Sequence, residues 1–184
     1  MGKAAARRGW IAGWGLAISL VLAVLAIIPG PARAAEVFFS PEGGARARLV
    51  QAIRESRQQI DVAVYHITSI ELADALATAS ARGVRVRILT DRERLTDPVR
   101  ALQILRRSAI PLQALGAPES SLMHHKFAIF DDRLVGTGSY NWTNPAERAN
   151  YENLVILDDP DLVGRFRREF DRLWRAAKEV AHSD

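Results

Sequence analysis

The sequence has 184 residues, a length that indicates one domain rather than two. It contains 25 Lys and Arg, 21 Asp and Glu, and no cysteine. The lack of cysteine excludes thiol nucleophiles, cysteine-based zinc sites and disulfide bonds, so stability has to come from the hydrophobic core.

The first 34 residues differ in composition from the rest. They begin with basic residues, continue with an apolar, uncharged stretch at 11–28, and end with small residues after a proline break. This order predicts a secretory signal peptide, residues 1–34, cleaved after Ala34 to leave a catalytic domain of residues 35–184. The mature protein is then expected in the periplasm or outside the cell. The alternative is that the apolar stretch remains as an N-terminal membrane anchor.

Cleavage would also change the charge balance. Four basic residues lie in the leader and all the acidic residues lie beyond it, which leaves 21 residues of each sign. Net charge is therefore a poor argument for nucleic-acid binding, and a polyanion would have to meet a local basic surface. Beyond the leader, only Lys126 and Lys178 are lysines, against 19 arginines. A compact, rotatable ammonium group suits a phosphate oxygen in a tight site.

Hydrophobic periodicity predicts strands that alternate with helices along the mature chain. The predicted strands are 37–39, 60–65, 84–89, 110–115, 124–130, 134–138 and 153–157. The predicted helices are 45–56, 68–81 behind a Thr68–Glu71 capping box, 98–107 behind an Asp97-Pro98 start, and the chain from Pro160 onward. Segments 116–122 and 143–148 are predicted to be loops. The alternation indicates an α/β fold with a mixed sheet flanked by helices on both faces.

The most informative segment has the spacing H-x-K-x4-D-x6-G-S-x-N, which comprises His124, Lys126, Asp131, Gly138, Ser139 and Asn141. Strand residues two apart share a face, so His124 and Lys126 project together while His125 points the other way. Ser139 and Asn141 repeat this spacing after the next strand, and the short turn at 131–133 makes the two strands a hairpin. An imidazole, an ammonium, a hydroxyl and an amide thus converge, a set that suits an anionic phosphoryl centre.

This pattern resembles the phospholipase D superfamily, and in particular its small single-motif bacterial endonucleases. The resemblance runs from about Val37 to the last helix. It includes the segments Phe39-Ser40-Pro41-Glu42-Gly43 and Asn150-Tyr151-Glu152-Asn153. It implies the α-β-α sandwich of phospholipase D-like proteins.

The resemblance also implies a two-step hydrolysis of phosphodiesters that needs no metal or other cofactor. Neutral His124 would attack phosphorus and form a phosphohistidine. Lys126, Ser139 and Asn141 would hold the non-bridging oxygens, and Glu152 would bond the far nitrogen of His124 and fix its tautomer. Asp131 lies five residues beyond Lys126, about 16 Å along the strand at 3.3 Å per residue, and is predicted to be structural.

One motif supplies one histidine, whereas the reaction needs both a nucleophile and a general acid. The other histidines are predicted to have other places: His66 as a polar residue at a strand end, His125 as a core or interface residue, and His182 in a disordered terminus. A two-fold homodimer with His124 of both subunits in one site would supply both groups, and the resemblance implies the same arrangement.

Other charged groups allow more than one reading. Arg85 and Arg87 alternate on one strand face, which suits either a phosphate-binding row or an ordinary solvated face. The arginines of the last helix lie among acidic residues, which predicts a solvated, ion-paired helix.

Three functions follow from these observations. The favoured one is an exported, metal-independent, non-specific endonuclease of DNA or RNA. The alternative is a phospholipase D that hydrolyses phosphatidyl headgroups, such as that of phosphatidylcholine, with the same site chemistry. The third is a nucleic-acid-binding module with an inactive site, against which the complete polar set of the motif argues. The choice between DNA and RNA, and between single and double strands, stays open.

Overall fold

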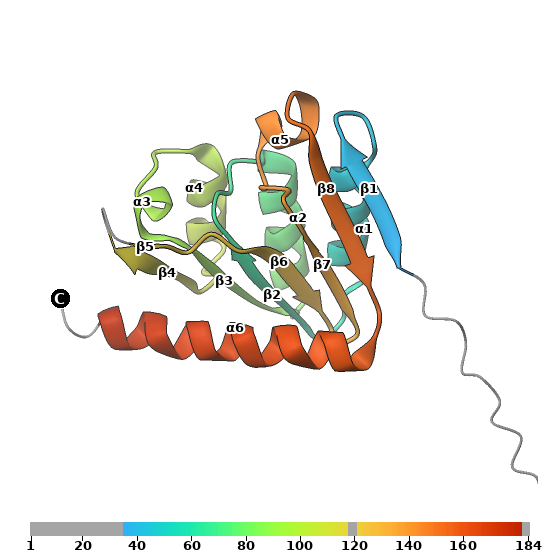
Figure 1. The fold of residues 1–184 in the computed structure, drawn as a ribbon. Helices are drawn as coiled ribbons and strands as arrows, with labels where there is room; N and C mark the ends of the chain where they lie inside the picture. The colour runs from blue at the N-terminus through green and yellow to red at the C-terminus, as the bar shows by residue number, and fades with distance from the viewer. Residues whose placement is uncertain (1–34, 118–120, 182–184) are drawn as a thin grey trace, which may run out of the picture. The chain divides into compact units, whose positions relative to one another are not determined.

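The computed structural model of the chain describes residues 35–117 and 121–181, so the predicted leader and His182 lie outside the described residues. These residues form one mixed sheet flanked by helices (Figure 1). The strands are β1 Glu36–Ser40, β2 Gln59–Val64, β3 Arg85–Asp91, β4 Leu112–Ala117, β5 Ser121–Leu122, β6 Lys126–Phe130, β7 Leu134–Gly138 and β8 Glu152–Leu157. The helices are α1 Ala45–Glu55, α2 Ile70–Ala81, α3 Arg92–Leu95, α4 Arg100–Arg107, α5 Asn144–Arg148 and α6 Pro160–Ala181.

The eight strands lie in the order β1-β8-β7-β6-β2-β3-β4-β5. The pairs β2–β3 and β3–β4 are parallel, and the other neighbouring strands are antiparallel. The predicted α/β class, with a mixed sheet and helices on both faces, is confirmed. Within residues 35–117 and 121–181, none of the helices has the length and apolar character needed to cross a membrane.

The central strand β2 divides the core into two layers. Ile60, Val62 and Val64 pack in the cluster that contains α1, α2 and α4, while Ala63 packs in the cluster formed with α6. This alternation follows from the two-residue repeat of a strand. Figure 1 shows α6 lying along one face of the sheet, with the other long helices behind it. The sheet is therefore the middle layer of an α-β-α sandwich.

Two predicted helix starts are wrong. Ser69, not Thr68, caps α2, because its hydroxyl accepts a hydrogen bond from the N–H of Leu72 while the Thr68 N–H bonds the Trp142 carbonyl. Asp97 does not open a helix either: its carboxylate lies 3.1 Å from the Nε2 of His66, and α4 begins only at Arg100.

Two segments predicted to be loops contain regular structure. The segment 116–122 holds the end of β4 and the short strand β5, which pair antiparallel. The segment 143–148 forms α5, whose first turn is capped by the Thr143 hydroxyl with Pro145 beside it. A proline and a threonine at a helix start give a local signal for this turn.

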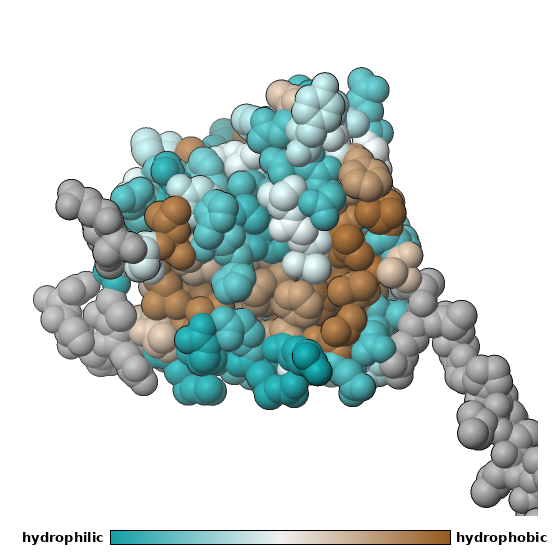
Figure 2. Space-filling view, in the orientation of Figure 1, coloured by the Kyte–Doolittle hydropathy of each residue, from teal (hydrophilic) through white to brown (hydrophobic). Residues whose placement is uncertain are grey.

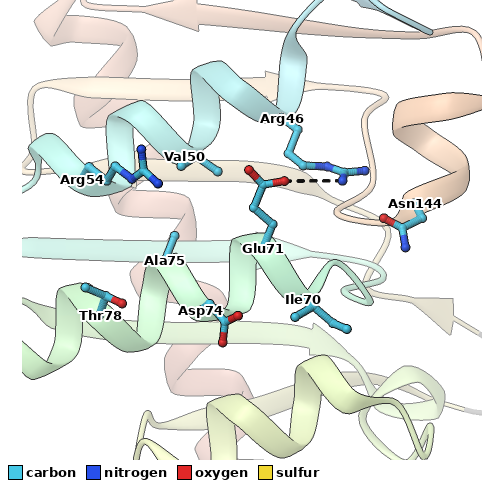
Figure 3. A pocket seen from close by; sticks show the side chains of 9 residues that line it. All are labelled: Arg46, Val50, Arg54, Ile70, Glu71, Asp74, Ala75, Thr78 and Asn144. Atoms are coloured by element: carbon cyan, nitrogen blue, oxygen red, sulfur yellow. Dashed lines mark ion pairs between the residues drawn. The ribbon is translucent and has the colours of Figure 1, made fainter.

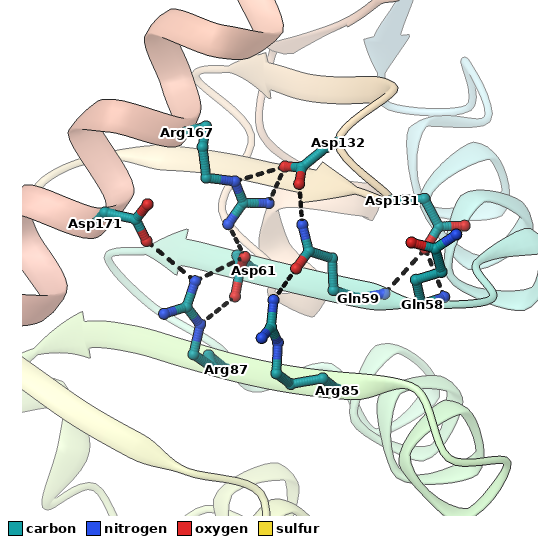
Figure 4. Close-up of polar contacts among 9 residues, drawn as sticks. All are labelled: Gln58, Gln59, Asp61, Arg85, Arg87, Asp131, Asp132, Arg167 and Asp171. Carbon is teal, nitrogen blue, oxygen red and sulfur yellow. Dashed lines mark hydrogen bonds and ion pairs between the residues drawn. The ribbon is translucent and has the colours of Figure 1, made fainter.

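The turn of the β6–β7 hairpin is fixed by Asp131. Asp131 and Asp132 both have positive φ angles, of 52° and 53°, as the central residues of the β-turn closed by the Arg133 N–H on the Phe130 carbonyl. The Asp131 carboxylate accepts hydrogen bonds of 2.8–3.0 Å from the backbone N–H groups of Arg57, Gln58 and Gln59 (Figure 4). Burial favours a raised pKa for Asp131, but these donors outweigh it and hold the pKa below its ordinary value. The carboxylate therefore fastens the hairpin to the start of β2.

A buried carboxylate, Asp61, joins α6 to the sheet. It is fully buried and pairs with Arg87 of β3 and Arg167 of α6 (Figure 4). Arg87 also bonds Asp171 at 3.2 Å and lies 4.8 Å from the ring centroid of Phe170. Both readings of this strand face are thus wrong for Arg87, which is neither solvated nor free to bind phosphate.

Its neighbour Arg85 belongs to the same set of contacts. Its guanidinium donates to Gln59, and Gln59 in turn donates to Asp132 in the hairpin turn (Figure 4). Arg167 also bonds Asp132. Arg85 is nevertheless exposed, so the solvated alternative holds for Arg85. A phosphate-binding row of Arg85 and Arg87 is not formed, because Arg87 is held in its ion pairs.

Part of the α6 face of the sheet is left uncovered over β1 and β8. Val37 and Phe39 of β1 are 55% and 60% exposed, and Leu162 of α6 is 39% exposed. Val155 faces the same side, because it pairs with Val37 while its chain neighbours are buried against α1. Figure 2 shows the hydrophobic surface over β8 and β1. These residues, with Leu157, are called the open sheet face below.

Replacement of Asp61 tests how α6 is held. We expect Asp61→Asn to lower the free energy of unfolding by about 3–5 kcal/mol, because it leaves two guanidinium groups without their buried counter-charge. Urea unfolding measures the change. The control is Glu169→Gln, the same chemical exchange in the exposed pair between Glu169 and Arg172. An equal effect of the two variants would show that the Asp61 pairs do not hold the helix.

Candidate active site

The sheet brings the predicted site residues to one edge. β6 begins at Lys126, the antiparallel β7 ends at Gly138, and β8, antiparallel to β7, begins at Glu152. Side chains that precede β6, follow β7 or open β8 therefore lie at the same end of the sheet. His124, Lys126, Ser139, Asn141 and Glu152 all meet this condition. Asp131 lies at the opposite end.

His124 and Lys126 share one aromatic neighbour, Tyr65, which follows β2. The imidazole of His124 lies 4.8 Å from the Tyr65 ring, centroid to centroid, and the Lys126 Nζ lies 5.2 Å from the same centroid. The Nζ also donates a 2.7 Å hydrogen bond to the backbone carbonyl of His124. Tyr65 and Lys126 thus fix where the imidazole lies.

Both groups have lowered pKa values. Burial against its neighbours lowers the pKa of His124, and the positive charge of Lys126 lowers it further, although Asp91 acts in the opposite direction. Burial also lowers the pKa of Lys126, which the Glu152 charge partly opposes. A lowered pKa keeps the imidazole neutral at neutral pH, the form that can act as a nucleophile.

Ser139 is held against β8 by three contacts. Its hydroxyl donates a 2.5 Å hydrogen bond to Glu152 and accepts one of 3.1 Å from the N–H of Asn153. Its backbone N–H bonds the Asn153 carbonyl. This approach requires Gly138, because a Cβ there would lie 2.1 Å from the Asn153 carbonyl oxygen. The hydroxyl position thus depends on the glycine before it.

Glu152 differs from its prediction. Its carboxylate accepts from Ser139 and from the side chain of Asn150, at 2.5 and 3.1 Å. Between His124 and Glu152, both within the described part of the chain, there is no hydrogen bond. The predicted role of fixing the His124 tautomer is therefore absent in a single chain, where Glu152 orients Ser139 instead.

Asn141 is placed by backbone contacts on both sides. The next residue, Trp142, is buried; its N–H donates to the His66 carbonyl, and its own carbonyl accepts from the N–H groups of Thr68 and Ser69. The Asn141 Oδ1 is buried without a hydrogen-bond partner among the described residues. A buried amide oxygen without a partner is costly, so the Asn141 side chain has an unmet hydrogen-bonding need at the site edge.

The other two histidines of the described residues, His66 and His125, have carboxylate neighbours. His66 follows β2, as predicted, with its Nε2 3.1 Å from Asp97. His125 was predicted to be a core or interface residue, and the core reading is wrong: its side chain is 48% exposed, with Nε2 3.6 Å from Glu169 of α6. It faces away from His124, as the strand alternation predicted.

Two functional neighbours of His124 were missed by the sequence reading. Tyr65 lies beside it only because β2 and β6 are adjacent, a pairing between distant segments. Asp91, buried at the end of β3, accepts a 2.9 Å hydrogen bond from the Met123 N–H and so holds the segment that enters the site. A polar residue at the carboxyl end of a parallel strand is a usable signal for such a role.

Two pockets differ in their relation to these residues. One, of ≈660 Å³, adjoins His124 and is lined by apolar side chains such as Leu115, Leu122 and Leu173 and by polar ones such as Ser121, His125 and Arg172. The other, of ≈550 Å³, lies between α1 and α2 and holds an Arg46–Glu71 ion pair of 3.6 Å (Figure 3). Of these two, only the first contains a residue of the motif, and it is called the His124 pocket below.

Similarity to known proteins was found at three levels. Residues 49–174 match the family described as "Cardiolipin synthase, PLD-like domain". The chain is 37% identical over 135 residues to mitochondrial cardiolipin hydrolase of Homo sapiens, covering 73% of this chain and 53% of that protein. It is 32% identical over 146 residues to that of Chlamydomonas reinhardtii, covering 79% and 65%. The chain thus spans between half and two thirds of these relatives.

Two solved structures resemble the chain over nearly their whole length. Nuc from Salmonella typhimurium, described as a phospholipase D family member, has a TM-score of 0.70 and 32% identity, covering 78% of this chain and 95% of that chain. NucT from Helicobacter pylori has a TM-score of 0.69 and 25% identity, covering 78% and 96%. With the His124–Lys126 motif at the sheet edge, these matches show that the chain belongs to the phospholipase D superfamily of phosphodiester hydrolases.

Proposed function

We propose that the protein is a metal-independent endonuclease of DNA or RNA that works through a phosphohistidine. The observation that carries the proposal is the lowered pKa of His124, held beside Lys126 at the edge that also holds Ser139 and Asn141. In the first step an imidazole nitrogen forms a bond to phosphorus while the bond to the leaving oxygen breaks and that oxygen takes a proton. In the second step water attacks phosphorus and gives its proton to the group that protonated the leaving oxygen, and the nitrogen–phosphorus bond breaks.

The neighbouring groups stabilise the negative charge that develops on phosphorus. Lys126 supplies a positive charge, and the amide of Asn141 supplies hydrogen-bond donors to the non-bridging oxygens. Ser139 supplies a hydroxyl whose orientation is set by Glu152. In this proposal Glu152 acts through Ser139 rather than through His124.

The proposed enzyme is a homodimer with a shared site. The first step needs a group that protonates the leaving oxygen, and His66 and His125 both lie against carboxylates of their own. A second copy would bring its own His124 to the site. The open sheet face supports this arrangement, because exposed Val37 and Phe39 form part of an apolar surface of the kind that subunit interfaces cover.

A phospholipase is the second candidate. It is favoured by the apolar side chains of the His124 pocket, such as Leu122 and Leu173, and by the relatives named mitochondrial cardiolipin hydrolase. Nucleic acid ranks first because the chain spans 95% of Nuc but only 53% of the human hydrolase. The same pocket is also lined by His125 and Arg172, whose charge and polarity suit an anionic polymer better than acyl chains. We further propose that the protein is exported through its leader, into the periplasm or out of the cell.

A substrate panel with the purified protein tests the proposal. We expect cleavage of plasmid DNA or RNA to continue in EDTA and to be lost in His124→Asn. Phosphatidylcholine and cardiolipin in detergent micelles form the lipid arm. Loss of all cleavage on chelation would contradict the mechanism, and lipid turnover that exceeds nucleic-acid turnover would favour the second candidate.

Mixed dimers test the shared site. Excess His124→Asn, exchanged into wild-type protein, should suppress activity, because a mixed dimer lacks either the nucleophile or the acid. The variant itself should remain folded and dimeric, with a stability change within about 1–2 kcal/mol. Light scattering gives the oligomeric state. Activity that follows only the number of wild-type chains would show that one chain holds the whole site.

The pKa of His124 is a separate prediction, measured by NMR titration of the imidazole resonances. We expect it below the ordinary value of 6.5, because burial and Lys126 disfavour the charged ring. The neutral nucleophile is then present above this lowered pKa and is lost only as the pH falls through it. Lys126→Gln should raise the pKa, whereas Arg107→Gln, an exposed change on α4, should not. A wild-type pKa at or above 6.5 would contradict the prediction.

A further inference from the structure

A second cation lies on the β2–β3 side of His124. The guanidinium carbon of Arg94 lies 5.4 Å from the centroid of the Tyr65 ring, the same ring that contacts His124 at 4.8 Å. The Nε of Arg94 donates a 3.1 Å hydrogen bond to the Tyr65 hydroxyl. Arg94 belongs to α3, which directly follows the buried end of β3. One aromatic ring therefore contacts both the proposed nucleophile and a positioned guanidinium.

The outer nitrogens of Arg94 are each in a long ion pair but not in a hydrogen bond with a carboxylate. Its two carboxylate neighbours, Glu93 and Asp97, lie 3.8 and 3.7 Å away, beyond hydrogen-bond length. Asp97 lies closer to His66, at 3.1 Å. The Arg94 side chain is one third exposed, so an anion can approach it from solvent without displacing buried groups.

We propose that Arg94, held by Tyr65, binds the phosphate adjacent to the scissile one. A guanidinium binds phosphate through two parallel hydrogen bonds, and its fixed Nε contact leaves the terminal nitrogens for this purpose. Successive phosphates of one strand are joined through a sugar and lie farther apart than their rise of about 3.4 Å along the helix axis. That separation leaves room for the Tyr65 ring, which contacts both His124 and Arg94, beside the two phosphates. The inference rests on the proposed function and narrows its substrate to chains with consecutive phosphodiesters.

Short oligonucleotides separate this subsite from the chemistry. The thymidine dinucleotide has one phosphodiester and the trinucleotide has two. We expect wild type to show a kcat/KM per bond about tenfold higher for the trinucleotide than for the dinucleotide, and Arg94→Gln to bring this ratio close to one. Because both substrates are compared in the same variant, a general loss of catalysis does not change the ratio. The same ratio should appear in the dissociation constants of labelled oligonucleotides measured in the inactive His124→Asn protein.

Two further variants set the limits of the effect. Tyr65→Phe keeps the ring against His124 but removes the oxygen that Arg94 bonds, so the ratio should fall by less than in Arg94→Gln. Arg107→Gln removes the same charge at the end of α4 remote from the site edge and should leave the ratio unchanged. The dependence of binding on salt should also weaken in Arg94→Gln, by a slope of about 0.7 for one lost contact to a single strand.

The outcomes distinguish the subsite from the proposed function. An unchanged ratio in Arg94→Gln, or an equal fall in Arg107→Gln, overturns the subsite. Cardiolipin has two phosphodiesters and phosphatidylglycerol has one. If Arg94→Gln lowers the preference for cardiolipin over phosphatidylglycerol but leaves the oligonucleotide ratio constant, the polynucleotide assignment is overturned. If wild type hydrolyses neither bis(4-nitrophenyl) phosphate nor any oligonucleotide, the proposed function is wrong. The subsite is still tested in that case, by the oligonucleotide binding measurements.

Discussion

The register of β6 on β2 is the constraint on which the site depends. In a strand, a shift of one residue moves every side chain to the opposite face. A shift of this kind in β6 would place His125 and Phe127 on the site face in place of His124 and Lys126. The register is fixed at the far end of β6, where the Asp131 carboxylate bonds three successive N–H groups at the start of β2. Asp131, the third residue of the motif, thus fixes the register that places the first two, His124 and Lys126.

The charged contacts under α6 serve specificity of packing more than stability. Burial of Asp61 with Arg87 and Arg167 costs desolvation that the ion pairs offset only in part, and apolar residues could fill the same space. A set of directional bonds, however, allows α6 only one position along the sheet. That position matters because Leu173 of α6 lines the His124 pocket.

The sequence was informative where its signals were local. The order of the longer strands and helices, the hairpin and its turn follow from periodicity and turn chemistry, and the motif places its polar groups at one edge. The short elements α3, β5 and α5 were not predicted, and two helix starts were placed wrongly. The errors in side-chain contacts concern partners that only the fold decides. Glu152 bonds Ser139 because β7 and β8 are neighbours, and Arg87 meets Asp61 because β3 lies beside β2. Neither strand pairing can be inferred from the periodicity of the sequence.

In the proposed mechanism, one chain can bind a phosphate but lacks a clear group to protonate the leaving oxygen. Lys126 and Asn141 offer charge and donors, and His124 offers a neutral nucleophile, whereas the other two histidines of the described residues both lie beside carboxylates. The β8 strand links this gap to the open sheet face, since it begins at Glu152 in the site and continues through Val155 on that face. A second copy seated on the open sheet face would therefore lie beside the catalytic edge, so covering the apolar surface and completing the chemistry are two consequences of one contact.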